Sequence, residues 1–548
     1  MTGTPRLTAL VANGRGLLAV HDGHSGRAGR LADAGNLLRG EQERVVVWSA
    51  RRDLHGLVAA HAPPPRVLDL AEGHRLLFGG WAAGPDEVWA ARHDLPREGI
   101  PPDTPDDLFA VLVGPTAEEE LVTAGGYLRP DAVAGRWQST PERLIRWAGA
   151  AYECGVRTRT ALERLGSRAV SAAVSESSAA VLCLELERDG LPIDRPAVEE
   201  LIAASAGRRP RDEREAQEIR ASRDAEVLRH APGHEGVDLR NPAAVKELLL
   251  AIGLDVPSTR KWVLEPYREA HPLVGALLAW RADERIATTY GFGWLERHVG
   301  ADDRLRGAWT ACDGAAGRMT AQNGLHNLPT ALRPGVAAAP GWVFVRADLG
   351  QIEPRVLACV AQDHALAAAT QSDDLYAPVA ARLGIDRSRA KVAVLAAMYG
   401  QRSGAAGEAL AGLQRAYPIA MAFLDRAYES GVAGADLRTF GGRLIRTAGP
   451  HDAGSRGRYA RNALIQGAAA ELFKAWAATV RVTTADLGAE VVLCLHDELL
   501  VHTPEAAAEE CAARVGQALT DAARRWSGAA PVRFVTDTRI IRRWSEAK

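Results

Sequence analysis

The chain contains 548 residues, with 66 Lys and Arg residues against 68 Asp and Glu residues and a formal net charge of −2. At roughly 150 residues per domain, this length allows three or four domains. The near-neutral charge gives no global basic field. This weighs against a nucleic-acid partner without excluding one, because a local basic patch is enough to bind phosphates.

The cysteines and the apolar stretches indicate the compartment. No two cysteines form a CxxC pair, so we interpret them as reduced thiols rather than as a disulfide framework or a zinc site. No N-terminal run has the form of a signal peptide, and we expect no stretch of about 18 apolar residues that could span a membrane. A cytoplasmic protein with no membrane partner is therefore expected. The cysteines are Cys154, Cys183, Cys312, Cys359, Cys494 and Cys511.

Residues 1 to about 165 alternate strand and helix patterns, separated by Pro- and Gly-rich breaks at 62–65 and 99–105. Strands that alternate with helices predict a mixed sheet covered by helices, an α/β arrangement. The expected strands are Leu7–Ala12, Gly16–Val20, Arg44–Trp48 and Arg66–Leu70. The expected helices are Leu54–His61, Ala71–Phe78 and Pro141–Leu165.

Residues 166 to about 300 are rich in helical patterns. Ser175–Asp189 is amphipathic and ends at Gly190. Pro196–His230 carries many Arg and Glu residues at helical spacing, which favours a solvated helical face with i,i+4 ion pairs over an arm that follows a phosphate backbone. Asn241 followed by Pro predicts a capped helix start.

Two stretches in residues 301–548 end apolar strands in carboxylates. Val491–His502 predicts a β-hairpin whose tip is His496-Asp497-Glu498. Val343–Arg355 predicts a strand that ends at Asp348 and turns into a helix. A lone Asp at such a place is usually a helix cap or a surface residue. Two of them together predict a site for hard divalent cations and an in-line phosphoryl transfer.

A third stretch, Arg387–Gly400, predicts a helix with one distinctive face. Steps of four residues place Arg387, Lys391, Leu395 and Tyr399 on that face. The two cations suit the phosphates of a nucleoside triphosphate, and the lower part suits stacking on its base. An ordinary amphipathic helix with basic ends explains any single residue, but explains the whole pattern poorly.

Five motifs, in their order along the chain, resemble those of family A DNA polymerases of the DNA polymerase I (Klenow) type. The resemblance is strong from about 300 to 548, weaker from 180 to 300, and faint before residue 180. In the middle region, Leu184–Asp194 is similar to the start of the family's palm and thumb. It suggests the bacterial 3′–5′ exonuclease/DNA polymerase form without a 5′-nuclease domain. The motifs are Gly317–Pro329, Asp348–Glu353 (motif A), Arg387–Gly400 (motif B), the Arg458-x3-Asn462-x3-Gln466-Gly467 helix, and His496–Glu498 (motif C).

The resemblance implies catalytic roles. Asp348 and Asp497 would hold two Mg²⁺ ions, with Mn²⁺ as an alternative, and Glu498 would support the site. Lys391 and Arg387 would clamp the triphosphate and neutralise developing charge.

The resemblance also implies contacts with the nucleotide and the DNA. Glu353 would be the steric gate against ribose, and the partners would be primer–template DNA and deoxynucleoside triphosphates, bound by a monomer. The remaining nucleotide-binding residues would be Gln351, Leu395, Tyr399 and Tyr376. The DNA-binding residues would be Arg318, Asn327, Gln466, Asn462, Arg458, His496 and Gly400, with Arg333 as a further phosphate contact.

The chain departs from the family pattern at several positions. Leu349-Gly350 replaces the usual Tyr-Ser after the motif A Asp, and Pro354 replaces a Leu. Leu395 stands where an aromatic residue packs on the sugar, and Tyr376 stands where a His contacts the triphosphate. These changes bear on speed and affinity more than on reaction type, because both metal-binding Asp residues remain.

In this family, the preceding domain is often an RNase H-like 3′–5′ exonuclease with about four carboxylates around two metals. The Asp-x-Glu pair is missing from the first strand region, which reads Leu17-Leu-Ala-Val-His-Asp-Gly. Asp53 and Glu153 stand near the other two motifs, but we interpret them as surface residues. We therefore expect a retained fold with lost or severely weakened exonuclease activity.

The sequence thus predicts a multidomain α/β and α+β protein: an RNase H-like domain (1–170), the start of a right-hand polymerase with its thumb (171–310), and palm and fingers (311–548, fingers about 365–440). We expect a template-directed DNA polymerase of DNA replication or repair in a bacterial cytoplasm, associated with the nucleoid. Intact Asp348, Asp497, Lys391 and Arg387 argue against an idle primer–template binding factor. Glu353 and the form of the hairpin tip argue against a single-subunit RNA polymerase.

Overall fold

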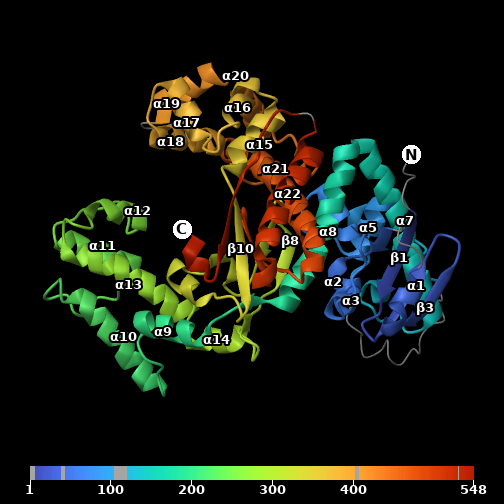
Figure 1. The fold of residues 1–548 in the computed structure, drawn as a ribbon, viewed down its shortest axis with the longest axis horizontal. Helices are drawn as coiled ribbons and strands as arrows, with labels where there is room; N and C mark the ends of the chain where they lie inside the picture. Colours follow the sequence, from blue (N-terminus) through green and yellow to red (C-terminus); the bar gives the residue numbers. More distant parts are fainter. Residues whose placement is uncertain (1–5, 39–43, 104–119, 401–405, 529, 548) are drawn as a thin grey trace. The chain divides into compact units, whose positions relative to one another are not determined.

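The computed structural model describes residues 6–38, 44–103, 120–400, 406–528 and 530–547 (Figure 1). The chain divides into two compact units. The first comprises 1–189, 308–321 and 341–540, and the second comprises 190–307, 322–340 and 541–548. The three-domain division expected from the sequence does not coincide with these units and stays a prediction.

The N-terminal part of the first unit is built on a five-stranded sheet with the order β3-β2-β1-β4-β5 (Figure 1). β1 is parallel to β4, β4 is parallel to β5, and β2 is antiparallel to both β1 and β3. This is the mixed sheet that the sequence predicted. The strands are β1 (Leu7–Ala12), β2 (Leu17–His21), β3 (Gly26–Arg30), β4 (Arg44–Val47) and β5 (Val67–Asp69).

Alternating side chains divide the core between the two faces of this sheet. On β1, Ala9 and Val11 belong to one buried cluster and Leu10 belongs to the other. Such alternation is what a strand with a period of two produces. The expectation missed β3, since its sequence Gly-Arg-Ala-Gly-Arg has no apolar alternation.

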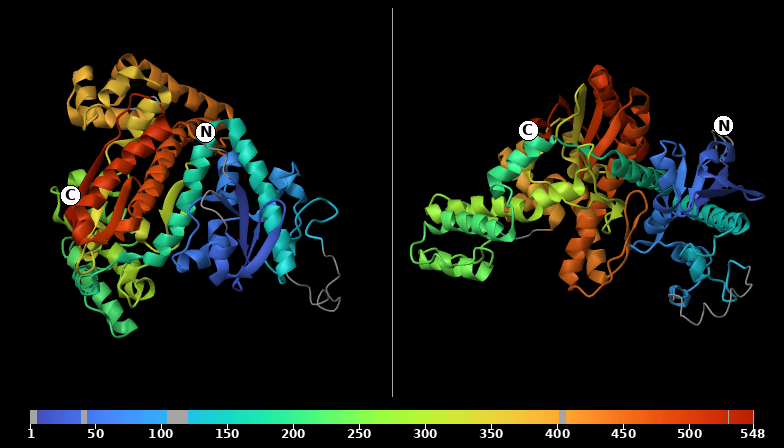
Figure 2. Two further views of the ribbon diagram at one scale, coloured as in Figure 1. Left: turned by 45° about the vertical axis from the view of Figure 1, so that its right-hand side comes forward. Right: turned by 90° about the horizontal axis from the view of Figure 1, so that it is seen from below.

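Helices cover both faces of this sheet, and Figure 2 shows the long cyan helices beside the blue strands. α7 begins at a Thr140 cap, whose hydroxyl accepts from the Arg143 amide at 3.3 Å. The helices of this region are α1 (Ala34–Leu37), α2 (Ala50–Asp53), α3 (His55–Ala59), α4 (Leu70–Phe78), α5 (Pro85–Arg92), α6 (Pro130–Val133), α7 (Pro141–Leu165) and α8 (Ser167–Asp189).

α8 overturns one expectation. It is the one helix among the described residues that is long and apolar enough to cross a membrane, with a mean hydropathy of 1.4 in its most apolar window, whereas we expected no such stretch. The same window is 61% buried inside the protein. Because α8 packs against β5 and α21 (Ala453–Thr483), its apolar side chains are accounted for by the protein core.

A buried ion cluster joins α8 to the C-terminal part of the first unit. Glu176 of α8 lies 2.7 Å from Arg443 and 2.5 Å from Lys474 of α21, measured between carboxylate oxygens and side-chain nitrogens. All three side chains are at most 3% exposed. The two cations hold the pKa of Glu176 below its usual value despite its burial.

The C-terminal part of the first unit contains a four-stranded sheet with the order β13-β14-β10-β15. α22 (Ala508–Ser527) packs against β10, β14 and α21. The strands are β10 (Trp342–Leu349), β13 (Glu490–Leu495), β14 (Glu498–Pro504) and β15 (Thr536–Ile541), with small hairpins β8–β9 (Trp309–Asp313, Arg318–Ala321) and β11–β12 (Leu437–Arg438, Leu444–Ile445).

A helical segment separates β10 from α21 in the chain. Within it, α18 (Arg387–Tyr399) begins where the Asp386 carboxylate accepts from the Arg389 amide at 2.9 Å, and ends at Gly400, whose φ is +72°. The remaining helices are α15 (Ile352–Ala361), α16 (His364–Ala369), α17 (Tyr376–Leu383), α19 (Ala406–Ala416) and α20 (Pro418–Ala433).

The second unit is mostly helical. Its Arg- and Glu-rich stretch breaks at Gly207, whose φ is +87°. The helix that follows contains the expected i,i+4 pair Arg214–Glu218, and Arg211, just before its N-cap, pairs with Glu215. Asn241 caps α11 as predicted. The elements are α9 (Arg195–Ala206), α10 (Glu213–Leu228), α11 (Pro242–Ala251), α12 (Lys261–Leu264), α13 (Pro272–Thr289), α14 (Phe292–His298) and the short strands β6 (Leu191–Pro192) and β7 (Arg304–Leu305).

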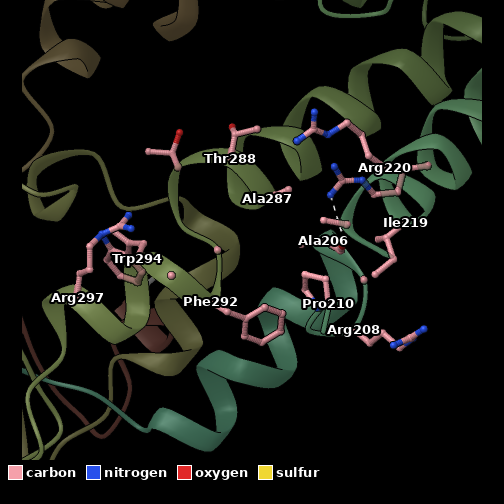
Figure 3. Close-up of a pocket in the computed structure, with 16 residues that line it drawn as sticks. Ala206, Arg208, Pro210, Ile219, Arg220, Ala287, Thr288, Phe292, Trp294 and Arg297 are labelled. Atoms are coloured by element: carbon pink, nitrogen blue, oxygen red, sulfur yellow. Dashed lines mark hydrogen bonds between the residues drawn. The ribbon is translucent and has the colours of Figure 1, made fainter. Parts of the chain in front are cut away.

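A pocket of about 440 Å³ in the second unit is lined by α9, α10, α13 and α14 and the turns that follow them (Figure 3). It contains several arginines, and two of these are already paired: Arg208 with Glu215, and Arg223 with Glu284. Arg223 also donates to the Ala206 carbonyl oxygen at 3.3 Å, the bond drawn in Figure 3. This pocket contains none of the strand-end carboxylates singled out in the sequence.

Candidate active site

The hairpin predicted around residue 497 is present. β13 and β14 are antiparallel, Leu495 pairs with Glu498, and His496 and Asp497 form the connection. His496 adopts a φ of +56°, in the left-handed region that a tight connection requires. The tip is one residue shorter than expected, because Glu498 already belongs to β14.

The neighbouring strand β10 brings Asp348 to this tip. β10 and β14 are antiparallel, with Asp348 directly opposite Glu498. The next amide, Leu349 N–H, donates to the carbonyl oxygen of Asp497 at 2.9 Å. Asp348 therefore meets the adjacent carboxylates Asp497 and Glu498, about 150 residues later in the sequence, at one end of the four-stranded sheet.

The local electrostatics disfavour bare negative charge at this end. Burial, followed by repulsion from Asp497, raises the pKa of Asp348 to about 6. Burial, with the charges of Glu498 and Glu353, also raises the pKa of Asp497. A bound cation would relieve this repulsion and favour the ionised forms.

The donor set fits a hard divalent cation. Asp348 and Asp497 offer carboxylate oxygens, which Mg²⁺ prefers, and Mg²⁺ is commonly held by one or two carboxylates with water and substrate phosphates completing its shell. Within the described ranges, no group of three or more His, Cys, Asp or Glu side chains has metal-site geometry.

Arg346 is a site residue that the sequence reasoning missed. Its guanidinium lies 2.6 Å from Asp348 and 2.9 Å from Glu498, and its side chain is only 8% exposed. The signal was available, since residues i and i+2 of a strand share a face, and Arg346 stands two residues before Asp348.

A cavity of about 290 Å³ opens beside the carboxylates, and Glu353 is held at its wall. The Tyr399 hydroxyl donates to Glu353 Oε2 at 3.1 Å, and Arg318 Nη2 lies 3.5 Å from Glu353 Oε1. Burial raises the pKa of Glu353. The lining residues are Arg318, Met319, Leu349, Ile352, Glu353, Gln466, Ala469, Ala470, Phe473, His496 and Asp497.

The predicted face of α18 is present, and its two cations are in different states. Arg387 forms an ion pair with Asp374 at 2.5 Å and lies over the ring of Tyr376 at 5.9 Å. Lys391 is exposed and makes no hydrogen bond or ion pair to any residue that the structure describes. Tyr376 is buried, which raises the pKa of its phenol to about 12.

The turn from β10 into α15 explains two motif A positions. Gln351 has a φ of +48°, and its side-chain oxygen accepts from the Leu375 amide at 3.0 Å. The side-chain carbonyl of Gln351 therefore stabilises the local structure through this hydrogen bond. Pro354 occupies the first turn of α15, where a missing N–H costs little because the first amides of a helix have no partner within it.

α21 provides a row of side chains at intervals of four. Asn462 and Gln466 are half-buried among fully buried neighbours, and Gln466 reaches the cavity. Arg458 is exposed and donates to the Ser455 hydroxyl at 2.8 Å. A Cβ on Gly400 would lie 3.3 Å from the Arg458 Cγ, so this glycine permits a close approach.

Two predicted DNA contacts belong to the second unit. Asn327 is exposed, and its backbone oxygen accepts from the Tyr290 hydroxyl at 2.8 Å. The Arg333 guanidinium lies 4.1 Å from the centre of the Trp544 ring. The roles expected for both side chains stay predictions.

The N-terminal carboxylates are arranged differently. Asp53 is 1% exposed and accepts from the Trp48 amide at 2.8 Å and the Ala12 amide at 3.2 Å, so the expectation that it lies at the surface is wrong. Burial raises its pKa to about 7. Glu153 is a surface residue as expected, with its carboxylate 2.9 Å from Arg157 and 3.0 Å from His93.

Comparison with known proteins gives consistent results. The family model described as DNA polymerase family A matches residues 234–546. DNA polymerase I of Chloroflexus aurantiacus is 30% identical over 46% of this chain and 30% of its own length. The thermostable DNA polymerase I of Thermus filiformis is 30% identical over 48% of this chain and 36% of its own length. The chain thus spans about a third of these curated relatives.

One solved structure extends the likeness of the fold to nearly the whole chain. It is described as the POL domain of Pol1 from M. smegmatis in complex with a DNA primer-template and dNTP. The TM-score is 0.70 at 20% identity, and the match covers 98% of this chain and 95% of that one.

Proposed function

The chain belongs to DNA polymerase family A, and from this premise we propose that it is a template-directed DNA polymerase that adds deoxynucleotides to a primer 3′ end. The observation that carries the proposal is the meeting of Asp348 on β10 with Asp497 at the tip of the β13–β14 hairpin, beside an open cavity. The helix with Lys391 and Arg387 supports it, because a triphosphate needs cations next to the metal-binding carboxylates.

The carboxylates would hold two Mg²⁺ ions, or Mn²⁺. Metal ions bound there would lower the pKa of the primer 3′-hydroxyl and stabilise the charge of the leaving pyrophosphate. Asp348 and Asp497 would hold them and fix the line of attack, and Glu498 would support the site from the base of the hairpin. The raised pKa values of both Asp residues favour this assignment, since burial and then neighbouring carboxylates disfavour their ionised forms and a bound cation would offset both effects.

The helix α18 would bind the triphosphate in two ways. Lys391 is exposed and unpaired in the described part of the chain, so its ammonium can meet a phosphate without first breaking an ion pair. Arg387 would exchange Asp374 for a phosphate oxygen, and the loss of this ion pair costs little because it is exposed to solvent. Both cations would neutralise charge that develops during transfer.

Glu353 would act on the sugar. It is held between Tyr399 and Arg318 at the cavity wall, so a ribose 2′-hydroxyl would meet a carboxylate that has little freedom to move aside. Arg318 and Gln466 line the same cavity and would contact minor-groove acceptors that all four correct pairs share. Asn462, Arg458, His496 and Gly400 would complete this contact with the primer–template.

The N-terminal domain would be an RNase H-like domain that has lost proofreading. The sheet order 3-2-1-4-5, in which only strand 2 is antiparallel to its neighbours, supports the fold assignment. β1 through β4 contain no Asp or Glu, and Asp53 and Asp69 accept hydrogen bonds from buried backbone amides. Few carboxylates remain to hold a second pair of metals.

A primer-extension gel with labelled primer–template tests both statements. With Mg²⁺ and four deoxynucleotides, we expect extension by the wild type and by Asp521→Ala, a control that removes an exposed carboxylate from α22, and no extension by Asp497→Ala. With Mg²⁺ alone, we expect no shortening of the primer. Primer binding without extension by the wild type would disprove polymerisation and favour a binding factor, and shortening that survives in Asp497→Ala would disprove the loss of proofreading.

A further inference from the structure

Arg346 connects three strands of the four-stranded sheet through carboxylates. Its Nε lies 2.9 Å from Glu498 Oε1 on β14, its Nη2 lies 2.6 Å from Asp348 Oδ2 on its own strand β10, and its Nη1 lies 3.3 Å from Asp537 Oδ2 on β15. Each of the three guanidinium nitrogens therefore has a carboxylate partner. Such charge-assisted bonds are stronger than bonds between neutral groups.

The position of Arg346 follows from strand geometry. It stands two residues before Asp348, so both side chains leave β10 on the same face. Glu498 is directly opposite Asp348, and Leu500 is directly opposite Arg346. A cation is thus fixed beside the carboxylates by the register of the sheet.

This arrangement occupies atoms that a metal would need. Asp348 Oδ2 already accepts a hydrogen bond from Arg346. Glu498 Oε1 also accepts one from Arg346, and the Glu498 side chain is only 11% exposed. Asp497 makes no hydrogen bond or ion pair with the guanidinium of Arg346, and it lines the cavity.

We propose that Arg346 is a built-in counter-cation that competes with divalent metal for Asp348 and keeps Glu498 out of the metal's coordination shell. It is a positioning residue, since it acts through the carboxylates and not on the substrate. The proposal rests on the proposed function, which assigns metal binding to Asp348 and Asp497. Metal binding must displace or share the bond at Asp348, so the resident charge weakens metal affinity and preorders the empty site.

A purely structural role predicts the opposite behaviour. If Arg346 only holds Asp348 in place, removing the guanidinium frees the carboxylate to move and weakens metal binding. If Arg346 competes, removing its charge strengthens metal binding. The sign of the change in affinity separates the two roles.

The experiment is a titration of the full-length protein, without DNA or nucleotide, with Mn²⁺, following free Mn²⁺ by electron paramagnetic resonance. For Arg346→Gln, which removes the charge but keeps polar hydrogen-bonding groups, we expect a Kd lower by about tenfold. Arg346→Lys keeps a charge but cannot reach three carboxylates, so its Kd should be intermediate. The matched control is Arg539→Gln, because Arg539 pairs with Asp537 at 3.2 Å and makes no ion pair with Asp348. The Kd of this variant should equal that of the wild type.

Two further measurements make the outcome decisive. The double variant Arg346→Gln/Asp348→Asn should lose the added affinity, which locates the gain at Asp348. Thermal unfolding in EDTA and in Mn²⁺ reports folding, and Mn²⁺ should raise the melting temperature of Arg346→Gln more than that of the wild type. An unchanged or higher Kd in folded Arg346→Gln would overturn the inference, whereas failure of wild-type primer extension would overturn the proposed function alone.

Discussion

The two sheets of the first unit both have carboxylates at or near strand ends, but they use them differently. In the N-terminal sheet, Asp53 accepts from the amides of Ala12 and Trp48, and Asp69 accepts from the amide of Ala50 at 2.7 Å. In the C-terminal sheet, Asp348 faces Arg346 and a second carboxylate, beside a cavity. Asp53 and Asp69 therefore bond to the backbone of the fold, whereas Asp348 pairs with another side chain beside a cavity.

This difference shows that burial alone does not identify a site. Asp53 and Asp348 both have raised pKa values, to about 7 and about 6, and burial is the main cause for each. The second contribution distinguishes them. For Asp53 it is the attraction of Arg52, and for Asp348 it is the repulsion of Asp497. Repulsion between neighbouring carboxylates is what a bound cation would relieve.

The largest expected effect comes from Asp348→Asn. The substitution keeps the shape and a hydrogen bond to Arg346 but removes the charge that would hold metal. We expect primer extension to slow by at least about 10³-fold, equivalent to about 4 kcal/mol of transition-state stabilisation. Single-turnover extension measures this rate, and circular dichroism checks the fold. A folded variant that extends at the wild-type rate would remove the distinction between the two sheets.

Asp53→Ala should have the opposite profile to Asp348→Asn, with lower stability and unchanged catalysis. It leaves the amides of Ala12 and Trp48 without their acceptor in a buried setting, which costs about 1–3 kcal/mol per unsatisfied group. We expect the melting temperature to fall while the extension rate per folded molecule stays unchanged. Glu153→Ala, at the surface, is the control and should change neither. If Asp53→Ala instead abolished a Mg²⁺-dependent nuclease activity of the wild type, the N-terminal carboxylate would belong to a site.

The pH dependence of stability sharpens the comparison further. The pKa of Asp53 is raised from 3.8 to about 7 by burial, so the folded protein keeps a proton that the unfolded chain has lost. Its contribution is therefore fully present below about pH 4 and is lost as the pH rises towards 7, at about 1.4 kcal/mol per pH unit. Asp53→Asn should remove this slope in urea unfolding at pH 5, 6 and 7. An identical slope in both proteins would show that Asp53 is ionised when folded.

Glu353 stands between the two cases, since one oxygen accepts from Tyr399 while the carboxylate also borders the cavity. Tyr399→Phe removes a hydrogen bond worth about 0.5–1.5 kcal/mol and gives the carboxylate more freedom. We expect the preference for deoxy- over ribonucleotides to fall by about three- to tenfold, measured as the ratio of kcat/KM values. Tyr459→Phe, on the exposed side of α21, should leave this ratio unchanged.

Local sequence patterns predicted much of the fold and part of the site. The bounds of β1 and α7 follow from alternation and from a Thr cap, which are local signals. β3 lacked such a signal, because it is a Gly- and Arg-rich strand that is fixed by pairing with β2. The burial of Asp53 could not be predicted either, since its acceptor role depends on the Ala12 amide, 41 residues away.

The same distinction between local patterns and long-range contacts applies to the site. Asp348 and Asp497 were predicted because each ends an apolar strand, and the motif order connected them. The contacts of Arg346 depend on the register of three strands, so they become visible only when the sheet is assembled. The capture of the Gln351 side chain by the Leu375 amide depends on a turn with positive φ that no local pattern indicated.

The buried cluster of Glu176, Arg443 and Lys474 affects whether the N-terminal residues could be deleted from the chain. A chain that began after α8 would keep Arg443 and Lys474 but lose the carboxylate that both of them contact. Unpaired buried charges cost several kcal/mol each, which is comparable to the whole stability of a domain. Deletion of the first 189 residues would thus destabilise the rest of the first unit, whether or not those residues catalyse a reaction.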